Sequence, residues 1–392
     1  MRETGNEFAQ IIVRFAEQYI EQYHPNSFIT RTLDALQKCR TSALGGHKER
    51  CDCCRGERIS YNSCRNRHCP KCQAAKQAFW VEDRMKDALG VKYFHVVFTV
   101  PHELNALCMT DSAWFYNAMF QCVWQTLQGF GYSHYGVESG AICVLHTWGQ
   151  NLSFHPHIHC LVPAAGLTLK GDLKRITKQG KFLYPVEMLS AVFRGKLLGK
   201  MKRHLSELGQ LNEYQSLLDR LWRKSWVVDC ERPFGSPEHI VKYLGQYTHR
   251  VAISNQRIQH IDKDGVSFHM KDYADHGTSK LTHLTGVEFL HRFSLHILPR
   301  RFVRIRYYGI LSSKIKNGFK PEKQKAAAVT EISPVKETSQ ERLKRLTQFD
   351  VYQCPYCKKG RMKIVEVLPR IRSPGDILYP VKDKSKSLVI VN

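Results

Sequence analysis

The feature that most limits how this chain can fold is a block of cysteines near its start. Seven of the 14 cysteines lie between residues 39 and 72, and a late pair, Cys354 and Cys357, has the spacing CxxC. No charged leader with an apolar core opens the sequence, and histidines interrupt the uncharged run 139–169, so we expect a soluble cytoplasmic protein without a membrane partner. In that compartment the block predicts metal binding rather than disulfides.

Two CxxC pairs in the block fit a structural zinc site. Cys51 and Cys54 precede Cys69 and Cys72, and two such knuckles can place four sulfurs around one tetrahedral Zn²⁺. Four more residues of ligand type are interleaved with them and predict a second zinc in a cross-brace: Cys39, His47, Cys64 and His68. The alternative is reduced cysteines without metal. The late CxxC pair is either half of a zinc site completed elsewhere or simply two thiols.

Positive charge is concentrated in the second half of the chain. The sequence has 59 Lys and Arg against 35 Asp and Glu, a net charge of +24, and residues 171–392 hold 42 basic and 21 acidic residues. Because neutralising phosphates releases counterions, this imbalance predicts a nucleic-acid partner. An acidic membrane surface is the alternative, but no basic amphipathic helix with exposed aromatic residues stands out.

The hydrophobic pattern predicts an α+β protein in three parts. Helices are expected in 7–38 with a break at Pro25, in 73–89, 103–128, 185–223 and 237–251, and strands at 93–100, 141–148, 157–162 and in 258–308. We expect residues 1–90 to form a helical and zinc-binding domain and residues 91–320 to form the central domain. Residues 321–392 would be a linker and a basic C-terminal region with the late CxxC pair.

Two short motifs in the central part predict chemistry. His155, His157 and His159 alternate along a predicted strand and so share one face, where imidazoles can bind a divalent metal. Tyr243 and Tyr247 lie four residues apart on a predicted helix and also share a face. A tyrosine near a metal-bound phosphate is a competent nucleophile that would form a covalent phosphotyrosine. The structural alternative is ordinary core packing of these histidines and tyrosines.

At these motifs the sequence resembles a known family. CRTSALGGH, CDCC, YNSCRNRHCPKCQ, HPHIHC and KYLGQYTHRVAISNQRI are similar in kind and order to rolling-circle insertion-sequence transposases of the HUH class, more narrowly the bacterial two-tyrosine family with an N-terminal transposase zinc-binding domain. The similarity covers residues 25–320. It implies a single-strand DNA endonuclease and strand transferase on a ferredoxin-like antiparallel sheet. Such an enzyme nicks mobile-element ends through a 5′-phosphotyrosine intermediate.

The resemblance also implies roles for individual residues. His157 and His159 would bind a catalytic Mg²⁺ or Mn²⁺, and the tyrosine pair would supply the nucleophiles, in an order that the sequence does not give. Enzymes of this class usually have a third polar metal ligand. We favour His146 on the neighbouring predicted strand, with Gln150 and Gln246 as competitors.

Basic residues are expected to bind the DNA. The segment 300–309, RRFVRIRYYG, mixes arginine with aromatic residues and suits a single-strand channel with stacking platforms, the alternative being an amphipathic strand with a solvated basic face. The candidates are Arg65, Arg67, Lys242, Arg250, Arg300, Arg301, Arg304 and Arg306. Two other functions stay open, a plasmid or phage rolling-circle replication initiator and a non-catalytic zinc-dependent DNA-binding regulator. Assembly into a homo-oligomer also stays open.

Overall fold

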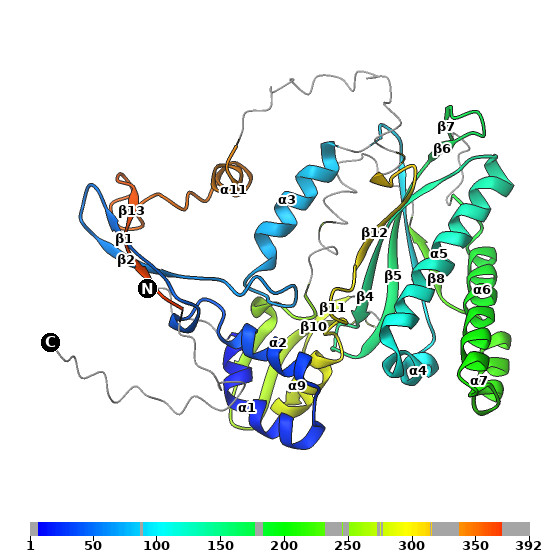
Figure 1. Cartoon of the computed structure of the whole chain (residues 1–392), viewed down its shortest axis with the longest axis horizontal. Helices are drawn as coiled ribbons and strands as arrows, with labels where there is room; N and C mark the ends of the chain where they lie inside the picture. Colours follow the sequence, from blue (N-terminus) through cyan, green and yellow to red (C-terminus); the bar gives the residue numbers. More distant parts are fainter. Residues whose placement is uncertain are drawn as a thin grey trace.

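The computed structural model describes residues 7–86, 89–176, 183–231, 245, 251–272, 275, 277–313, 315 and 337–370 (Figure 1). These residues form helices and antiparallel sheets, which confirms the predicted α+β class. Of the helix expected at 237–251, only Gly245, which is helical, and Val251 are described. Among the described helices, none is both long enough and apolar enough to cross a membrane.

Residues 93–309 contain a five-stranded antiparallel sheet, called the central sheet below, in the order β12–β4–β5–β3–β8 (Figure 1). Its strands are β3 (Tyr93–Thr99), β4 (Gly140–Trp148), β5 (Phe154–Pro163), β8 (Val228–Glu231) and β12 (Ile305–Gly309). The first three confirm the strands predicted at 93–100, 141–148 and 157–162. They are rich in β-branched and aromatic residues and almost uncharged, which suits strands that are buried on both faces.

Helices cover one face of this central sheet. α5 (Ser112–Tyr135) and α6 (Val186–Glu207) pack against every second residue of β3, β4 and β5, including Phe98 and Ile158. α4 (Asn105–Thr110) and α7 (Leu211–Arg223) extend this layer (Figure 1). Because side chains alternate along a strand, the histidines on either side of Ile158 face away from these helices.

The opposite face of the sheet carries α3 (Gln73–Lys86). Trp80 of α3 packs against a small apolar cluster that includes Val144 and Leu161, and its indole Nε1 donates a hydrogen bond to the hydroxyl of Tyr307, 2.9 Å away. α3 therefore lies on the same side of the sheet as the histidines of the HPHIHC motif.

The N-terminal helices share a core with a distant part of the chain. α1 (Phe8–Tyr23) and α2 (Ser27–Gln37) pack with α9 (Gly286–Ser294) and with the sheet of β9 (Ile258–Ile261), β10 (Gly265–Asp272) and β11 (Thr278–Thr285). The rings of Phe8 and Phe293 lie 4.3 Å apart between centroids. A Cβ on Gly286 would come within 2.2 Å of the Phe15 ring, so only glycine fits where α9 begins. Residues 7–37 therefore pack against residues 258–294 and share one hydrophobic core with them.

A third sheet pairs a C-terminal strand with the β1–β2 hairpin, in the order β13–β1–β2. It consists of β1 (Gly46–Cys51), β2 (Glu57–Tyr61) and β13 (Met362–Leu368), and α11 (Ser339–Thr347) precedes β13. The remaining elements are the β6–β7 hairpin (Ala165–Leu167, Leu173–Arg175) and the 3₁₀ turns Ser42–Leu44, His102–Leu104 and Asn255–Arg257. Neither α11 nor β13 is predicted by the sequence pattern.

A buried histidine links the N-terminal core to the central sheet and gives a pH-dependent prediction. His296 is 2% exposed; its Nε2 donates to the Leu152 carbonyl at 3.1 Å, and its Nδ1 lies 3.2 Å from the Thr147 hydroxyl. Burial lowers the pKa of His296 from 6.5 to about 4. Between these values only the unfolded state binds the proton, so the stability present above pH 6.5 is lost as the pH falls toward 4.

We expect wild-type protein to lose roughly 2–3 kcal/mol more unfolding free energy than the His296→Gln variant between pH 7 and pH 4.5. Urea unfolding of both proteins in the same buffers measures this difference, since any acid release of zinc affects both. Equal losses in the two proteins would contradict the assignment.

Candidate catalytic metal centre and cysteine clusters

Three histidines from two neighbouring strands converge on the α3 side of the central sheet. The β4–β5 register places His146 opposite His157, and His159 follows two residues later on the same face. Their ligand nitrogens all lie within 4.8 Å of one another. The structure therefore brings His146, the favoured third ligand, together with His157 and His159. His155 is exposed and lies outside this group.

The ring of His157 is oriented by the backbone. Its Nδ1 lies 2.7 Å from the carbonyl oxygen of His155, which can only accept, so Nδ1 carries the proton and Nε2 keeps its lone pair. Burial lowers the pKa of His157 to about 4. The imidazole is therefore neutral near pH 7, which is the state in which histidine binds a metal.

His159 is oriented by a fourth histidine that the motif does not contain. Its Nδ1 lies 2.9 Å from Nε2 of His95 on β3, both side chains are buried, and their rings stack 5.1 Å apart. When Nδ1 of His159 donates this hydrogen bond, its Nε2 is left with a lone pair for a metal, as is common for metal-binding histidines. Sequence reasoning missed His95, although a lone histidine within the apolar strand YFHVVFT is a visible signal.

Replacing His95 by alanine is expected to weaken Mn²⁺ binding by about 10–100-fold, because the ring of His159 loses the partner that fixes its orientation. The His95→Gln variant retains an acceptor at this position and should recover part of the affinity. Calorimetric titration of zinc-loaded protein with Mn²⁺ measures both. An alanine variant with wild-type Mn²⁺ affinity would remove His95 from the site.

The predicted nucleophiles, Tyr243 and Tyr247, lie outside the described residues, as does Gln246. Gly245 between them is described and buried. A Cβ on Gly245 would be 2.2 Å from Cγ2 of Val81, so its backbone lies directly against α3. The backbone carbonyl of Gln150, the other competitor for the third ligand, accepts a hydrogen bond from the guanidinium of Arg257.

Eight of the cysteines form two separate groups of four, and neither group is the predicted set of Cys51, Cys54, Cys69 and Cys72. The first cysteine cluster consists of Cys39, Cys64, Cys69 and Cys72, whose sulfurs all lie within 4.8 Å of one another. Two of its sulfur–sulfur distances, Cys39–Cys72 and Cys64–Cys72, are 3.6 and 3.7 Å. Four free thiols at this spacing fit a closed tetrahedral zinc site. Hydrogen bonds from the Cys64 and Cys69 thiols lower the pKa of Cys39 to about 7.

The other two predicted ligands, Cys51 and Cys54, lie at the turn of the β1–β2 hairpin and join Cys354 and Cys357 in the second cysteine cluster. The predicted grouping of Cys51 and Cys54 with Cys69 and Cys72 is therefore corrected. The reason is the hairpin itself: β1 has six residues, so its two ends are roughly 20 Å apart. The turn cannot reach the first cluster, which lies at the open end of the hairpin.

The histidines of the predicted cross-brace belong to neither cluster. His47 on β1 lies 3.4 Å from the carboxylate of Glu49. His68 is buried, and its pKa is lowered to about 3. Burial is the main cause, and the nearby positive charges of Arg304 and Arg67 add to it. His68 is therefore neutral, next to two arginines rather than to the cysteine sulfurs.

The predicted DNA-binding arginines differ in how far their side chains are exposed to solvent. Arg65, Arg300 and Arg301 are exposed, and Arg300 lines a cleft of about 1000 Å³ that Arg31 also lines. In contrast, Arg304 is 8% exposed, and Arg67 donates to the carbonyl of Phe302. The remaining candidates Lys242 and Arg250 lie outside the described residues.

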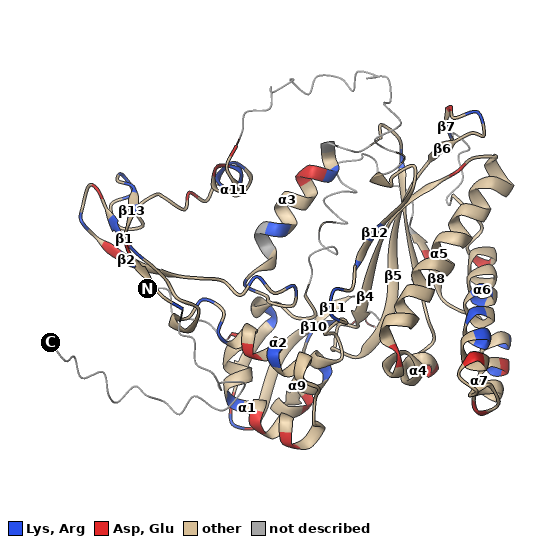
Figure 2. Ribbon diagram, viewed as in Figure 1, with Lys and Arg blue, Asp and Glu red and all other residues tan. Residues whose placement is uncertain are grey.

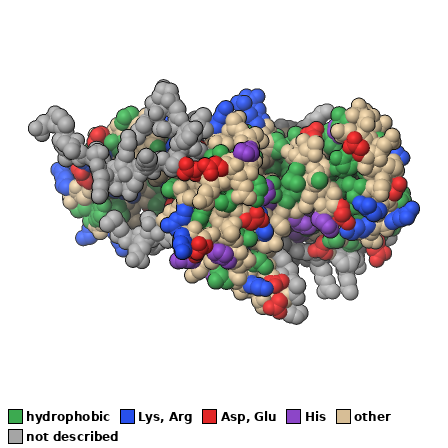
Figure 3. Space-filling model, turned by 90° about the horizontal axis from the view of Figure 1, so that it is seen from below, with side chains coloured by type: hydrophobic (Ala, Val, Ile, Leu, Met, Phe, Trp, Pro, Cys, Tyr) green, Lys and Arg blue, Asp and Glu red, His purple; other side chains and the backbone are tan. Residues whose placement is uncertain are grey.

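The aromatic residues of the 300–309 segment contact other side chains of the protein, and Phe302 is buried. Arg306 donates to Asn117 and lies over the ring of Phe120, while Tyr308 stacks on Trp124 at 5.1 Å. These contacts fit neither alternative fully: the rings contact protein side chains, and Arg304 is buried rather than part of a solvated basic face. Elsewhere, several Lys and Arg residues lie along α6 (Figure 2). On the face shown in Figure 3, basic side chains lie in several places, with acidic side chains between them.

Comparisons with known proteins match a zinc-binding domain to the part of the chain that contains the first cysteine cluster. The family model described as "Putative transposase" matches residues 140–318, and the model described as "Transposase zinc-binding domain" matches residues 11–100. The chain is 38% identical to "Putative transposase y4qJ" of Sinorhizobium fredii (strain NBRC 101917 / NGR234) over 392 residues, covering 95% of this chain and 98% of the relative. No solved structure matches significantly.

A second relative, "Transposase for insertion sequence element IS801" of Pseudomonas savastanoi pv. phaseolicola, is 26% identical over 337 residues, 83% of this chain and 81% of the relative. Zinc binding is supported both by the matched domain and by the cysteine clusters. The resemblance noted in the sequence is confirmed by a relative matched along nearly its whole length and by both domain models in the expected order. The chain belongs to the IS91 family of transposases, which transpose DNA in the rolling-circle manner.

Proposed function

We propose that this transposase is a metal-dependent single-strand DNA endonuclease and strand transferase. Its catalytic Mg²⁺ or Mn²⁺ would be held by His146, His157 and His159. The convergence of these three imidazoles within 4.8 Å carries the proposal. Imidazole nitrogens are common ligands of divalent metals, and oxygens of water and phosphate would complete the shell of the ion. When bound, the ion would polarise the scissile phosphate and stabilise the charge that develops on it.

Tyr243 or Tyr247 would supply the nucleophile. The tyrosine hydroxyl loses its proton, and its oxygen attacks the phosphorus while the bond from phosphorus to the 3′ oxygen of the upstream strand breaks. The upstream strand leaves with a 3′-hydroxyl, and the downstream strand stays linked to tyrosine through its 5′ phosphate. A 3′-hydroxyl of a target strand then attacks the phosphotyrosine, which forms a new phosphodiester and frees the tyrosine. Each step exchanges one phosphoester for another, so no ATP is needed.

The position of Gly245 supports this assignment. Gly245 lies between the two tyrosines in the sequence and contacts Val81 of α3, and α3 packs on the same face of the sheet that carries the three histidines. Because the substrate is DNA, we place the activity in the cytoplasm.

Covalent adduct formation tests the proposal. Single-stranded DNA from the ends of the element, labelled 3′ of the expected nick, is incubated with zinc-loaded protein with and without added Mg²⁺ or Mn²⁺ and resolved on a denaturing gel. We expect a metal-dependent adduct that survives SDS and disappears in the Tyr243→Phe/Tyr247→Phe variant. Tyr132→Phe, at an exposed site on α5, is the matched control and should form the adduct.

Two outcomes would replace the proposal. DNA binding without any adduct would favour the non-catalytic regulator. Cleavage of a plasmid or phage replication origin, but not of mobile-element ends, would favour the replication initiator. An adduct that persists in the double phenylalanine variant would move the nucleophile to another residue.

The contact between Gly245 and α3 gives a prediction that needs no change in either tyrosine. Gly245→Ala places a methyl group against Val81 and should reduce the rate of adduct formation by about tenfold or more, since small misplacements of a reacting group cost up to ~100-fold. DNA binding, measured by fluorescence anisotropy, should persist. Gly199→Ala is the control, because an added Cβ there meets nothing within 4 Å.

A second substitution makes this test specific. Val81→Ala removes Cγ2, the atom that the new methyl group would meet. The Gly245→Ala/Val81→Ala variant should therefore recover adduct formation. If Val81→Ala fails to restore activity, the loss has a cause other than this contact.

A further inference from the structure

The described C-terminal segment returns to the N-terminal hairpin. β13 pairs antiparallel with β1 along its whole length, from Gly46 opposite Leu368 to Cys51 opposite Met362 (Figure 1). This pairing brings the late CxxC motif to the turn of the β1–β2 hairpin, where Cys51 and Cys54 lie. Two short motifs about 300 residues apart in sequence are therefore neighbours in space.

The four sulfurs of this second cysteine cluster have the spacing of a zinc site. Cys51 Sγ lies 3.7 Å from Cys357 Sγ, and Cys54 Sγ lies 3.6 Å from Cys354 Sγ. All four lie within 4.8 Å of one another, and all are free thiols. Four sulfurs at 2.3 Å from a tetrahedral Zn²⁺ are roughly 3.8 Å apart, whereas bonded sulfurs are about 2 Å apart.

The two motifs have matching backbones. The amide of Cys51 donates to the Gly56 carbonyl and that of Cys354 to the Gly360 carbonyl, each at 2.9 Å. The residue after the second cysteine is left-handed in both, with φ of 61° at Arg55 and 57° at Lys358. Backbone amides also point at sulfur: those of Cys53 and Cys54 lie 3.3 and 3.4 Å from Cys51 Sγ, and that of Gly360 lies 3.3 Å from Cys357 Sγ.

The two turns also interlock. A Cβ on Gly360 would be 2.4 Å from Cys51 Sγ, and one on Gly56 would be 2.7 Å from the Tyr356 ring, so each turn approaches the other too closely for a side chain. Asp52 and Arg361 exchange two hydrogen bonds across the junction, at 3.0 and 2.8 Å. The four thiols are therefore held in one arrangement by contacts from both motifs.

We propose that Cys51, Cys54, Cys354 and Cys357 bind a second structural zinc that fastens the C-terminal segment to the N-terminal zinc-binding domain. A tetrahedral set of four sulfurs is typical of zinc. All four coordination positions are filled by protein, so this zinc has a structural role. The proposal is independent of the nuclease mechanism, because no residue of the second cluster belongs to the histidine group.

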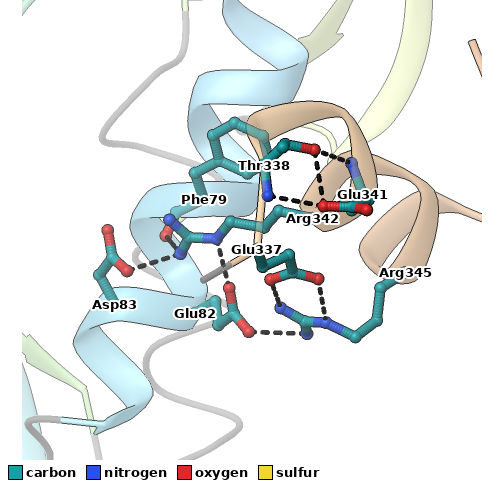
Figure 4. Close-up of polar contacts among 8 residues, drawn as sticks. All are labelled: Phe79, Glu82, Asp83, Glu337, Thr338, Glu341, Arg342 and Arg345. Atoms are coloured by element: carbon teal, nitrogen blue, oxygen red, sulfur yellow. Dashed lines mark hydrogen bonds and ion pairs between the residues drawn. The ribbon is translucent and has the colours of Figure 1, made fainter. Parts of the chain in front are cut away.

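The same segment has a second attachment, which acts without metal. Arg342 of α11 donates to Glu82, Asp83 and the Phe79 carbonyl of α3, and its guanidinium lies 4.7 Å from the centre of the Phe79 ring (Figure 4). Arg345 pairs with Glu82 and Glu337 (Figure 4). The C-terminal segment therefore contacts both the cysteine hairpin and α3.

Zinc content tests the proposal directly. Mass spectrometry of metals in wild-type protein is expected to give two zinc ions per chain, and the Cys354→Ser/Cys357→Ser variant is expected to give one. Cys53→Ser is the matched control, because Cys53 is exposed beside the cluster but outside it, and should retain both ions. Arg342→Ala should also retain both. One zinc in wild-type protein, or two in the double variant, would overturn the proposal.

Differential alkylation of unmodified protein gives an answer that does not depend on whether a variant folds. With zinc bound, N-ethylmaleimide should label Cys53 and leave the four cysteines of the second cluster unreacted. After zinc removal by a chelator these four should react. Reaction of Cys354 and Cys357 in zinc-loaded protein would refute the site, as would a disulfide between Cys54 and Cys354 in place of the metal.

Discussion

Replacing both His157 and His159 by alanine is expected to reduce metal-dependent cleavage of single-stranded DNA by at least about 1000-fold. Stabilisation of phosphoryl charge by a metal contributes several kcal/mol, and each 1.36 kcal/mol corresponds to tenfold in rate. One remaining imidazole, His146, cannot hold the ion alone. The rate of adduct formation at saturating Mn²⁺ measures the effect, and zinc content and the circular dichroism spectrum should be unchanged.

A neighbouring histidine provides the control for this loss. His155→Ala changes an exposed residue on the same strand that lies outside the three-histidine group, and should cleave within about threefold of wild type. His146→Ala removes the third ligand and should show an intermediate loss that higher Mn²⁺ concentrations partly restore. Equal activity of the His157→Ala/His159→Ala variant and wild type would show that the group is not the catalytic centre.

The second large effect is expected at the first cysteine cluster. Cys69→Ser should remove one zinc and unfold the N-terminal helices, because Cys39 and Cys69 are fully buried in the core that α1 and α2 share with α9. Structural zinc contributes ~10–16 kcal/mol of apparent binding free energy, which exceeds or matches the ~5–15 kcal/mol total stability of a typical domain. Metal analysis and hydrogen exchange in residues 8–37 measure the two consequences.

Hydrogen exchange also locates the damage. The central sheet should remain protected in Cys69→Ser, since β3, β4 and β5 form their own core with α5 and α6. Cys53→Ser should behave as wild type. Full protection of α1 and α2 after loss of the zinc would mean that the helices are held by apolar packing alone.

Local sequence patterns predicted the three inner strands of the central sheet, whereas the edge strand β8 was not predicted. The strands at 93–99, 140–148 and 154–163 are recognisable because dense β-branched and aromatic residues without charge are typical of buried strands. Alternation along a strand was also enough to place His157 and His159 on one face. It could not identify His95, because the partner of a buried histidine depends on which strand lies next to it.

The cysteine partners could not be predicted for a related reason. CxxC spacing identifies a knuckle but does not say which second knuckle completes its site. Spacing along the chain favoured Cys69 and Cys72 as partners of Cys51 and Cys54, whereas strand pairing between β1 and β13 supplies Cys354 and Cys357 instead. The packing of α1 on α9, more than 260 residues away, likewise leaves no local trace in the sequence.

The position of β1 between β2 and β13 also fixes when this part of the molecule can be completed during translation. A ribosome that has just finished β1 must add more than 300 residues before it reaches the end of β13. At ~5–20 residues per second this takes on the order of 15–60 s. Throughout that interval one edge of β1 has no strand partner, and Cys51 and Cys54 have no second pair of thiols. The nascent chain can therefore assemble its central sheet before its first hairpin acquires its final neighbour.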